Sequence, residues 1–165
     1  MKQEPAIQVS PPCGPSDGQW LTTLWHSEWM GETMVSRGHI YHLQDLMALV
    51  AKIDEKPVGA ATYRLNDAGG CELLSINAAV AGVGVGTRLL EAVEEDCRRL
   101  GCGRVWLITS NDNLEALRFY QRRGYRIIAV YPGAIDEARQ TKPTIPVIGN
   151  FGIGVHDEIE LEKVL

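Results

Sequence analysis

Three glycines at alternate positions, Gly82, Gly84 and Gly86, stand directly before a run of apolar residues at helical spacing. Glycines let a backbone approach a ligand closely, and free N–H groups at the start of a helix bind anions, so the loop predicts a phosphate site. A P-loop is excluded because no Gly-Lys-Ser/Thr follows, and a dinucleotide motif because its third glycine would fall at Thr87 or Leu89. On these glycines alone, a loop that only packs helix against strand stays open.

The neighbouring elements are predicted to hold this loop between a strand and an amphipathic helix. Residues 46–53 and 58–64 are apolar runs joined by a polar turn, which is typical of an antiparallel hairpin, and Cys71 to Asn77 is a further strand. The helix after the loop is indicated by apolar residues at helical spacing, namely Leu89, Leu90, Val93, Cys97 and Leu100.

A second strand and helix follow in the chain. Residues 105–108 form a short apolar run, and Asn111-Asp112-Asn113 is typical of a helix start, with Asp112 and Glu115 predicted as a capping box. The last predicted strands are 125–131 and 157–164. The Pro- and Gly-rich connection between them, residues 132–154, is long enough to predict a functional or mobile segment.

The composition describes one ordinary domain. Residues 1–18 are rich in Pro and Gly and are predicted to form a flexible arm before a single domain over residues 19–165, whose first helix starts at Trp20 and stops at Gly31. The net charge of −5 disfavours nucleic acid as a partner. No membrane span or secretion signal is recognised, so a cytoplasmic protein is expected. The four scattered cysteines predict neither a metal site nor a disulfide framework.

The glycine loop gains meaning from the residues downstream. Ala81-Gly82-Val83-Gly84-Val85-Gly86 is followed by Asn113, by Phe119-Tyr120 and by Gly124-Tyr125. This combination resembles the GNAT superfamily of N-acetyltransferases, whose acetyl-CoA site has a Q/R-x-x-G-x-G/A loop and an Asn-bearing helix that ends in Phe-Tyr. The resemblance is firm over residues 71–130. It implies a mixed α/β (α+β) fold, with a mostly antiparallel central sheet whose middle strands splay apart and are flanked by helices.

The resemblance also implies how acetyl-CoA is held. The strand over residues 74–78 would splay from residues 105–109, and the pantetheine arm would lie between them, bonded by the backbone of Ile76 and Ala78 and by Asn113 from the other side. The family's leading Gln or Arg is replaced by Ala81, so the loop amides, with the Thr87 hydroxyl or Arg88, would have to hold the pyrophosphate. The predicted cofactor-binding residues are Ile76, Asn77, Ala78, Gly82, Val83, Gly84, Val85, Gly86, Thr87 and Asn113.

The implied reaction is transfer of acetyl to a primary amine of a small molecule or peptide, by direct attack in a ternary complex. Tyr120, two helical turns after Asn113, would protonate the departing thiolate. An alkyl amine has a pKa of about 10 and needs a base, for which Glu72 is the candidate. The alternatives are a core aromatic for Tyr120, and for Glu72 a solvated strand-edge carboxylate, with a water chain as the base.

The acceptor is less well specified. The resemblance assigns its walls to Trp25, Trp29, Glu32, Arg37, Tyr41 and residues 132–154, although tryptophans are also common in cores. Residues 82–126 carry a local charge of +2 and the rest of the chain −7, which favours a cationic amine. A non-catalytic acyl-CoA sensor and an interaction module whose loop only packs are the alternatives from other classes. Pairing as a homodimer is a further expectation from the family.

Overall fold

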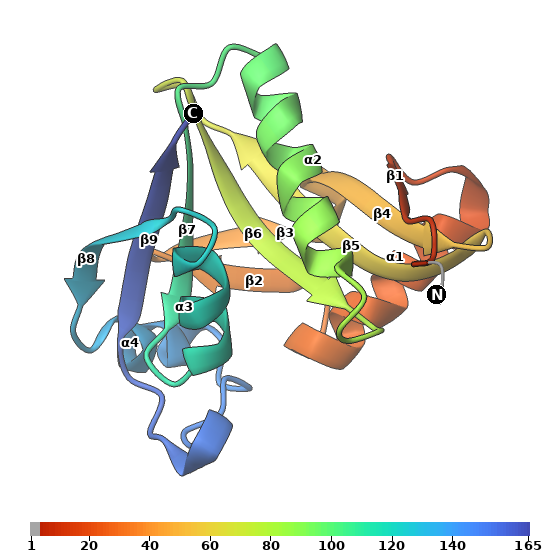
Figure 1. Ribbon diagram of the computed structural model, residues 1–165. Coiled ribbons are helices and arrows are strands. Elements are labelled where there is room, and N and C mark those ends of the chain that lie inside the picture. The colour runs from red at the N-terminus through yellow and green to blue at the C-terminus, as the bar shows by residue number, and fades with distance from the viewer. Residues whose placement is uncertain (1–3) are drawn as a thin grey trace.

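Residues 4–165 are described by a computed structural model, in which helices cover both faces of one large sheet (Figure 1). In chain order the elements are β1 (Gln8–Ser10), α1 (Gly14–Trp29), β2 (Thr33–Ser36), β3 (His39–His42), η1 (Leu43–Asp45), β4 (Met47–Ile53), β5 (Lys56–Leu65), β6 (Gly70–Ala78), α2 (Val85–Arg99), β7 (Arg104–Ser110), α3 (Leu114–Gln121), β8 (Arg126–Tyr131), α4 (Ala134–Thr141), η2 (Asn150–Gly152) and β9 (Glu158–Val164).

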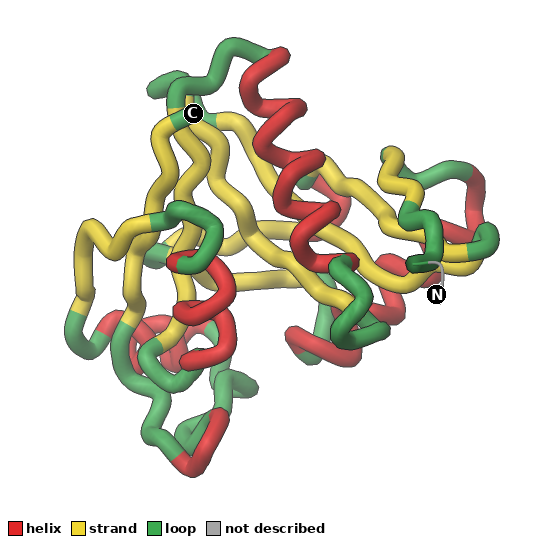
Figure 2. Tube along the Cα trace, viewed as in Figure 1, coloured by secondary structure: helices red, strands yellow, loops and turns green. Residues whose placement is uncertain are grey.

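The sheet confirms the predicted fold class. Its seven strands lie in the order β1-β4-β5-β6-β7-β9-β8, and every neighbouring pair is antiparallel except β6 with β7. The predicted hairpin is β4–β5, whose turn residues Asp54 and Glu55 have φ of 48° and 63°. The strands β2 and β3 form a separate pair beside this sheet (Figure 2).

The two parallel strands part halfway along their length. β6 and β7 are paired from Gly70↔Arg104 to Leu73↔Leu107, and no further pair joins them. Beyond that point β6 continues to pair with β5, and β7 with β9, so the sheet stays intact on either side of the opening. The predicted splay is therefore confirmed, and Figure 1 shows the two strands diverging.

The main core lies between the sheet and α2. Four of the five residues predicted on the apolar face of α2 are buried, namely Leu89, Leu90, Val93 and Cys97, whereas Leu100 follows the helix and is exposed. Burial of one such leucine stabilises the fold by about 1.5–3 kcal/mol. Gly59 on β5 permits the close approach, because a Cβ there would lie 2.6 Å from Val85 Cγ1. This packing fixes the start of α2 against β5 and β6.

The opposite face carries a smaller core under α1. Leu21 and Trp25 pack there with Leu43 and Ala60, and Trp25 is wholly buried, so it is a core residue. The helix starts at Gly14 rather than at Trp20 and ends at Trp29, where Met30 takes the left-handed conformation.

The expectation of a flexible arm over residues 1–18 is wrong for part of that segment. Residues 8–10 form β1, which pairs with β4, and residues 14–18 are the first turn of α1; residues 1–3 lie outside the described part of the chain. The connection 132–154, predicted to be functional or mobile, contains the helix α4 and the turn η2. Between residues 4 and 165, no helix combines the length and apolar character needed to cross a membrane.

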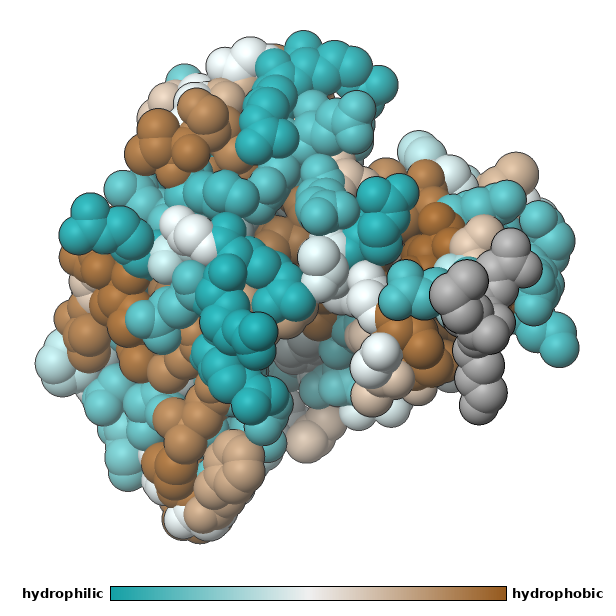
Figure 3. All heavy atoms as spheres, viewed as in Figure 1, coloured by the Kyte–Doolittle hydropathy of each residue, from teal (hydrophilic) through white to brown (hydrophobic). Residues whose placement is uncertain are grey.

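The free edge of the sheet at β8 is apolar. Ile127, Ile128 and Val130 are each about half exposed there, and Figure 3 shows apolar side chains gathered over this edge while polar ones cover α2 and α3. A register shift between Ile127 and Ala129 interrupts the pairing of β8 with β9. Pairing of two copies of the chain as a homodimer, expected from the family resemblance, stays a prediction.

Candidate active site

A cavity of about 590 Å³ opens where β6 and β7 part. Residues 72–77 of β6 and 107–110 of β7 form two of its walls, and the others come from α3, α4, the α1–β2 region and residues 145–155. Cavities of this volume are typical of small-molecule sites. The splay thus leaves a space that reaches through the sheet from the α3 side to the β2 side.

The glycine loop ends beside this opening. Gly82 and Gly84 have φ of 79° and 84°, a left-handed conformation that other residues rarely adopt. The helical bonds begin with Arg88 N–H donating to Gly84 O at 3.0 Å, so the N–H groups of residues 85–87 have no acceptor within the helix. Such N–H groups and the helix dipole favour an anion, and the phosphate site at this loop stays a prediction.

Tyr120 and Asn113 reach the cavity from α3. Tyr120 is 8% exposed and packs edge-on against Phe119 and Tyr125, and burial raises the pKa of its hydroxyl, which keeps the proton on the oxygen. Asn113 is the N-cap of α3, since its Oδ1 accepts from Ala116 N–H at 3.1 Å. Tyr120 therefore belongs to the main core and also lines the cavity, and its role as the acid stays a prediction.

The predicted capping box is wrong. The carboxylate of Asp112 accepts from the Ser110 hydroxyl and, at 2.8 and 3.0 Å, from the backbone and side-chain nitrogens of Asn150. Asp112 is thus bonded to a segment distant in the sequence, and the N-cap of α3 is the next residue, Asn113.

Glu72 lies on the cavity wall at 2% exposure, so the solvated strand-edge alternative is wrong. Its Oε2 accepts from the Tyr41 hydroxyl at 2.7 Å and its Oε1 from the Ser36 hydroxyl at 3.4 Å. Burial raises the pKa of Glu72, while the Tyr41 bond and the charge of Arg64 act in the opposite direction. A buried carboxyl with a raised pKa is suited to take a proton near neutral pH.

The β2–β3 hairpin, absent from the sequence-based expectations, supplies these partners. Its turn also reaches a second carboxylate, because Arg37 N–H donates to Glu158 Oε2 at 3.2 Å. Glu158, at the start of β9, lines the cavity at 3% exposure, and burial raises its pKa. Sequence reasoning placed Glu158 only within a strand, because its partners come from a hairpin about 120 residues earlier in the chain.

Comparison with known proteins shows to which family the chain belongs. Residues 18–125 match the Acetyltransferase (GNAT) family. The chain belongs to the GNAT family. The protein YdhI of Bacillus subtilis is 37% identical over 146 residues, covering 88% of this chain and 91% of YdhI.

Solved structures share the fold. A Bacillus subtilis acetyltransferase in complex with CoA has a TM-score of 0.73 at 17% identity, with 97% of this chain and 99% of that one covered. A GNAT family acetyltransferase from Elizabethkingia anophelis with acetyl-CoA bound has a TM-score of 0.72 at 20% identity, with 96% and 98% covered.

In this GNAT protein an arginine that follows α3 in the chain, Arg123, contacts the start of α2, and sequence reasoning does not single it out. Arg123 donates from Nε and Nη2 to Thr87 Oγ1 at 3.1 and 2.6 Å, and its guanidinium lies 3.8 Å from the ring centroid of Phe119. Arg88 is exposed and pairs with Glu91 instead. Arg123 rather than Arg88 therefore places a positive charge beside Thr87. No spacing in the sequence marks Arg123, because its contact joins the turn after α3 to the start of α2.

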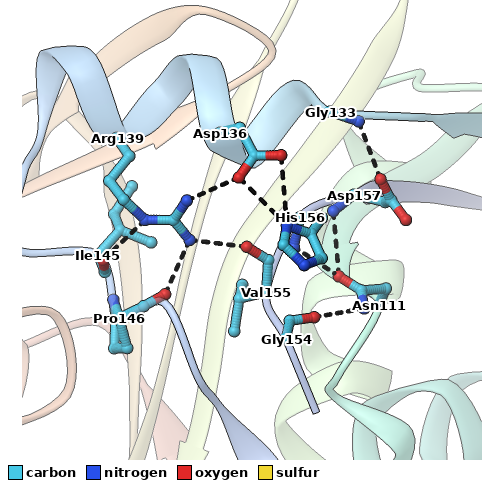
Figure 4. A network of polar contacts seen from close by, with 10 residues as sticks. All are labelled: Asn111, Gly133, Asp136, Arg139, Ile145, Pro146, Gly154, Val155, His156 and Asp157. Atoms are coloured by element: carbon cyan, nitrogen blue, oxygen red, sulfur yellow. Dashed lines mark hydrogen bonds and ion pairs between the residues drawn. The ribbon is translucent and has the colours of Figure 1, made fainter.

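Side-chain hydrogen bonds hold residues 145–155, which line the cavity together with α4. The Arg139 guanidinium donates to the carbonyls of Ile145, Pro146 and Val155, and Asn111 accepts from the N–H groups of His156 and Asp157 (Figure 4). Lys142 Nζ donates to the carbonyls of Trp29 and Thr33 at 2.6 and 2.5 Å. Residues 145–155 are thus an ordered wall of the cavity.

Only some of the residues expected in the walls of the acceptor pocket line the cavity. Trp29 lines the cavity, whereas Trp25 lies in the core and Glu32 approaches His26 at 3.9 Å on the surface. Arg37 and Tyr41 do not line the cavity themselves, but they donate hydrogen bonds to Glu158 and Glu72, which do.

Proposed function

We propose that this GNAT protein moves acetyl from acetyl-CoA to a primary amine of a small molecule or peptide by direct attack in a ternary complex. The observation that carries the proposal is that Glu72 and Tyr120 line the same cavity and reach it from opposite faces of the sheet. Cys71 and Leu73 belong to the core under α2, so the alternating strand turns Glu72 to the other face, whereas Tyr120 comes from α3. A base on one side and an acid on the other suit acetyl transfer across the opening.

The residues at the opening fit acetyl-CoA. Residues 74–78 of β6 have no partner on β7, so their backbone can bond the amides of the pantetheine arm. Asn77 Oδ1 is buried on the cavity wall and, among residues 4–165, has no hydrogen-bond partner, which suits an N–H donor of the arm. The N–H groups at the start of α2, with Thr87 and Arg123, suit the pyrophosphate.

The proton transfers are assigned to two side chains. Glu72 takes a proton from the acceptor ammonium, so that the neutral amine attacks the thioester carbonyl carbon. The C–N bond forms, the C–S bond breaks, and Tyr120 gives its proton to the departing thiolate sulfur. The amide nitrogen then loses its extra proton to solvent water, solvent returns a proton to the Tyr120 oxygen, and solvent removes the proton from Glu72.

Release of free thiol from acetyl-CoA, measured across a panel of amines, amino acids, aminoglycosides and peptides, tests the proposal. We expect thiol release with at least one amine, and loss of it in Tyr120→Phe with acetyl-CoA binding retained. Binding of acetyl-CoA without thiol release for any acceptor would favour the non-catalytic sensor. Absence of acetyl-CoA binding in a calorimetric titration would overturn both readings.

A further inference from the structure

The charged side chains around the cavity are mostly acidic. Those that line it are Glu28, Glu72, Asp112, Glu158 and Lys142. The ammonium of Lys142 already donates to two backbone carbonyls of the α1–β2 region, and the four carboxylates outnumber it. The cavity therefore offers negative charge to a ligand.

The three buried carboxylates differ in how they are used. Both oxygens of Glu72 accept from hydroxyl groups, and both oxygens of Asp112 accept from Ser110 or Asn150. Glu158 accepts only one bond, from Arg37 N–H to Oε2, and no donor within residues 4–165 reaches its Oε1. The residue is 3% exposed and lines the cavity, so this oxygen can accept from a donor that enters the cavity.

The sheet register places Glu158 on the acceptor side. Glu72 pairs with Trp106, and Trp106 and Ser110 of β7 pair with Glu162 and Glu158 of β9, so Glu72 and Glu158 point to the same face. Glu72 and Glu158 lie on strands separated by β7 and are offset by four residues along them, so at ordinary strand geometry their Cα atoms are about 16 Å apart. Their side chains approach each other at the hairpin turn, where the adjacent residues Ser36 and Arg37 each bond one of the two carboxylates. One nitrogen atom does not serve both.

We propose that Glu158 binds a second, cationic nitrogen of the acceptor, and that the substrate is a small molecule with two amino groups on a short chain. The inference rests on the proposed function. One amine is deprotonated at Glu72 and acetylated, while the other stays charged and donates to Glu158 Oε1. A cation with N–H donors satisfies the free oxygen and offsets the cost of burying its charge.

Calorimetric binding to the protein saturated with CoA tests Glu158 without requiring turnover. The probes are straight-chain diamines from propane to hexane, and the amino alcohols of equal length, which lack the second charge. We expect the best diamine to bind about tenfold more tightly than its amino alcohol. In Glu158→Gln, which keeps an oxygen for Arg37 N–H, this ratio should fall to about one. Glu160→Gln is the matched control, because Glu160 faces the same side but accepts from Tyr131 outside the cavity.

Equal binding of diamine and amino alcohol to the wild type overturns the inference, whether or not Glu158→Gln folds. A ratio that survives in Glu158→Gln, or is lost in Glu160→Gln as well, also overturns it. Thiol release with the same probes separates the two proposals. Diamine preference without thiol release would leave Glu158 as a cation site and defeat the proposed acetyl transfer, whereas thiol release without diamine preference would defeat only the role of Glu158.

Discussion

Replacing Tyr41 with phenylalanine should move the acid limb of the pH–rate profile. The Tyr41 hydroxyl donates to Glu72 Oε2 at 2.7 Å in a buried setting and so stabilises the ionised carboxylate. A hydrogen bond to a charged group is worth about 1.5–3 kcal/mol, and one pKa unit corresponds to about 1.36 kcal/mol. Removing the bond should therefore raise the pKa of Glu72 by about one to two units.

The shift should be visible in kcat/KM because Glu72 acts as a base and must be ionised in the free enzyme. With thiol release measured from acid to neutral pH, the acid limb of Tyr41→Phe should lie about one unit or more above that of the wild type. The other groups that face Glu72 stay in place, namely Ser36 from β2, His39 from β3 and Arg64 from β5.

Tyr63→Phe is the matched control, since its hydroxyl bonds Asp96 of α2 on the opposite face. That variant should keep the wild-type limb. An acid limb that does not move in Tyr41→Phe, or moves to lower pH, would refute the assignment of Glu72 as the base.

Three further variants probe the donor side. Tyr120→Phe should lower kcat by about 100-fold with unchanged CoA affinity by calorimetry, and an unchanged kcat would exclude Tyr120 as the acid. Gly84→Ala, at φ 84°, and Gly69→Ala, at φ 76° in a distant turn, should each lower the free energy of unfolding by about 1 kcal/mol, but only Gly84→Ala should weaken CoA binding. Arg123→Met should weaken CoA binding by about tenfold and Arg88→Met by less than about twofold; the reverse order would assign the phosphate contact to Arg88.

The local parts of the fold could be predicted from sequence. The glycine loop, the α2 helix and the β4–β5 hairpin follow from residue type and spacing over short distances, and all three are present. The capping box failed because Asp112 has a tertiary partner, Asn150, that no local pattern reveals. The Pro- and Gly-rich composition before Trp20 predicts a loop, whereas α1 starts at Gly14, because proline is favoured in the first turn of a helix.

The acceptor side depended on contacts between distant segments. Glu72 was found because the family often has a glutamate on that strand, but its burial depends on Tyr41 and Ser36 of an unpredicted hairpin. Glu158 and Arg123 had no distinguishing spacing, and their importance comes from packing against Arg37 and Thr87.

Amide hydrogen exchange with and without CoA tests most directly whether acetyl-CoA lies in the opening between β6 and β7. We expect added CoA to slow exchange at residues 74–78 of β6 and at residues 85–87 at the start of α2, with little change in the β4–β5 turn. Binding of CoA that leaves exchange at both segments unchanged would contradict the placement of the donor site.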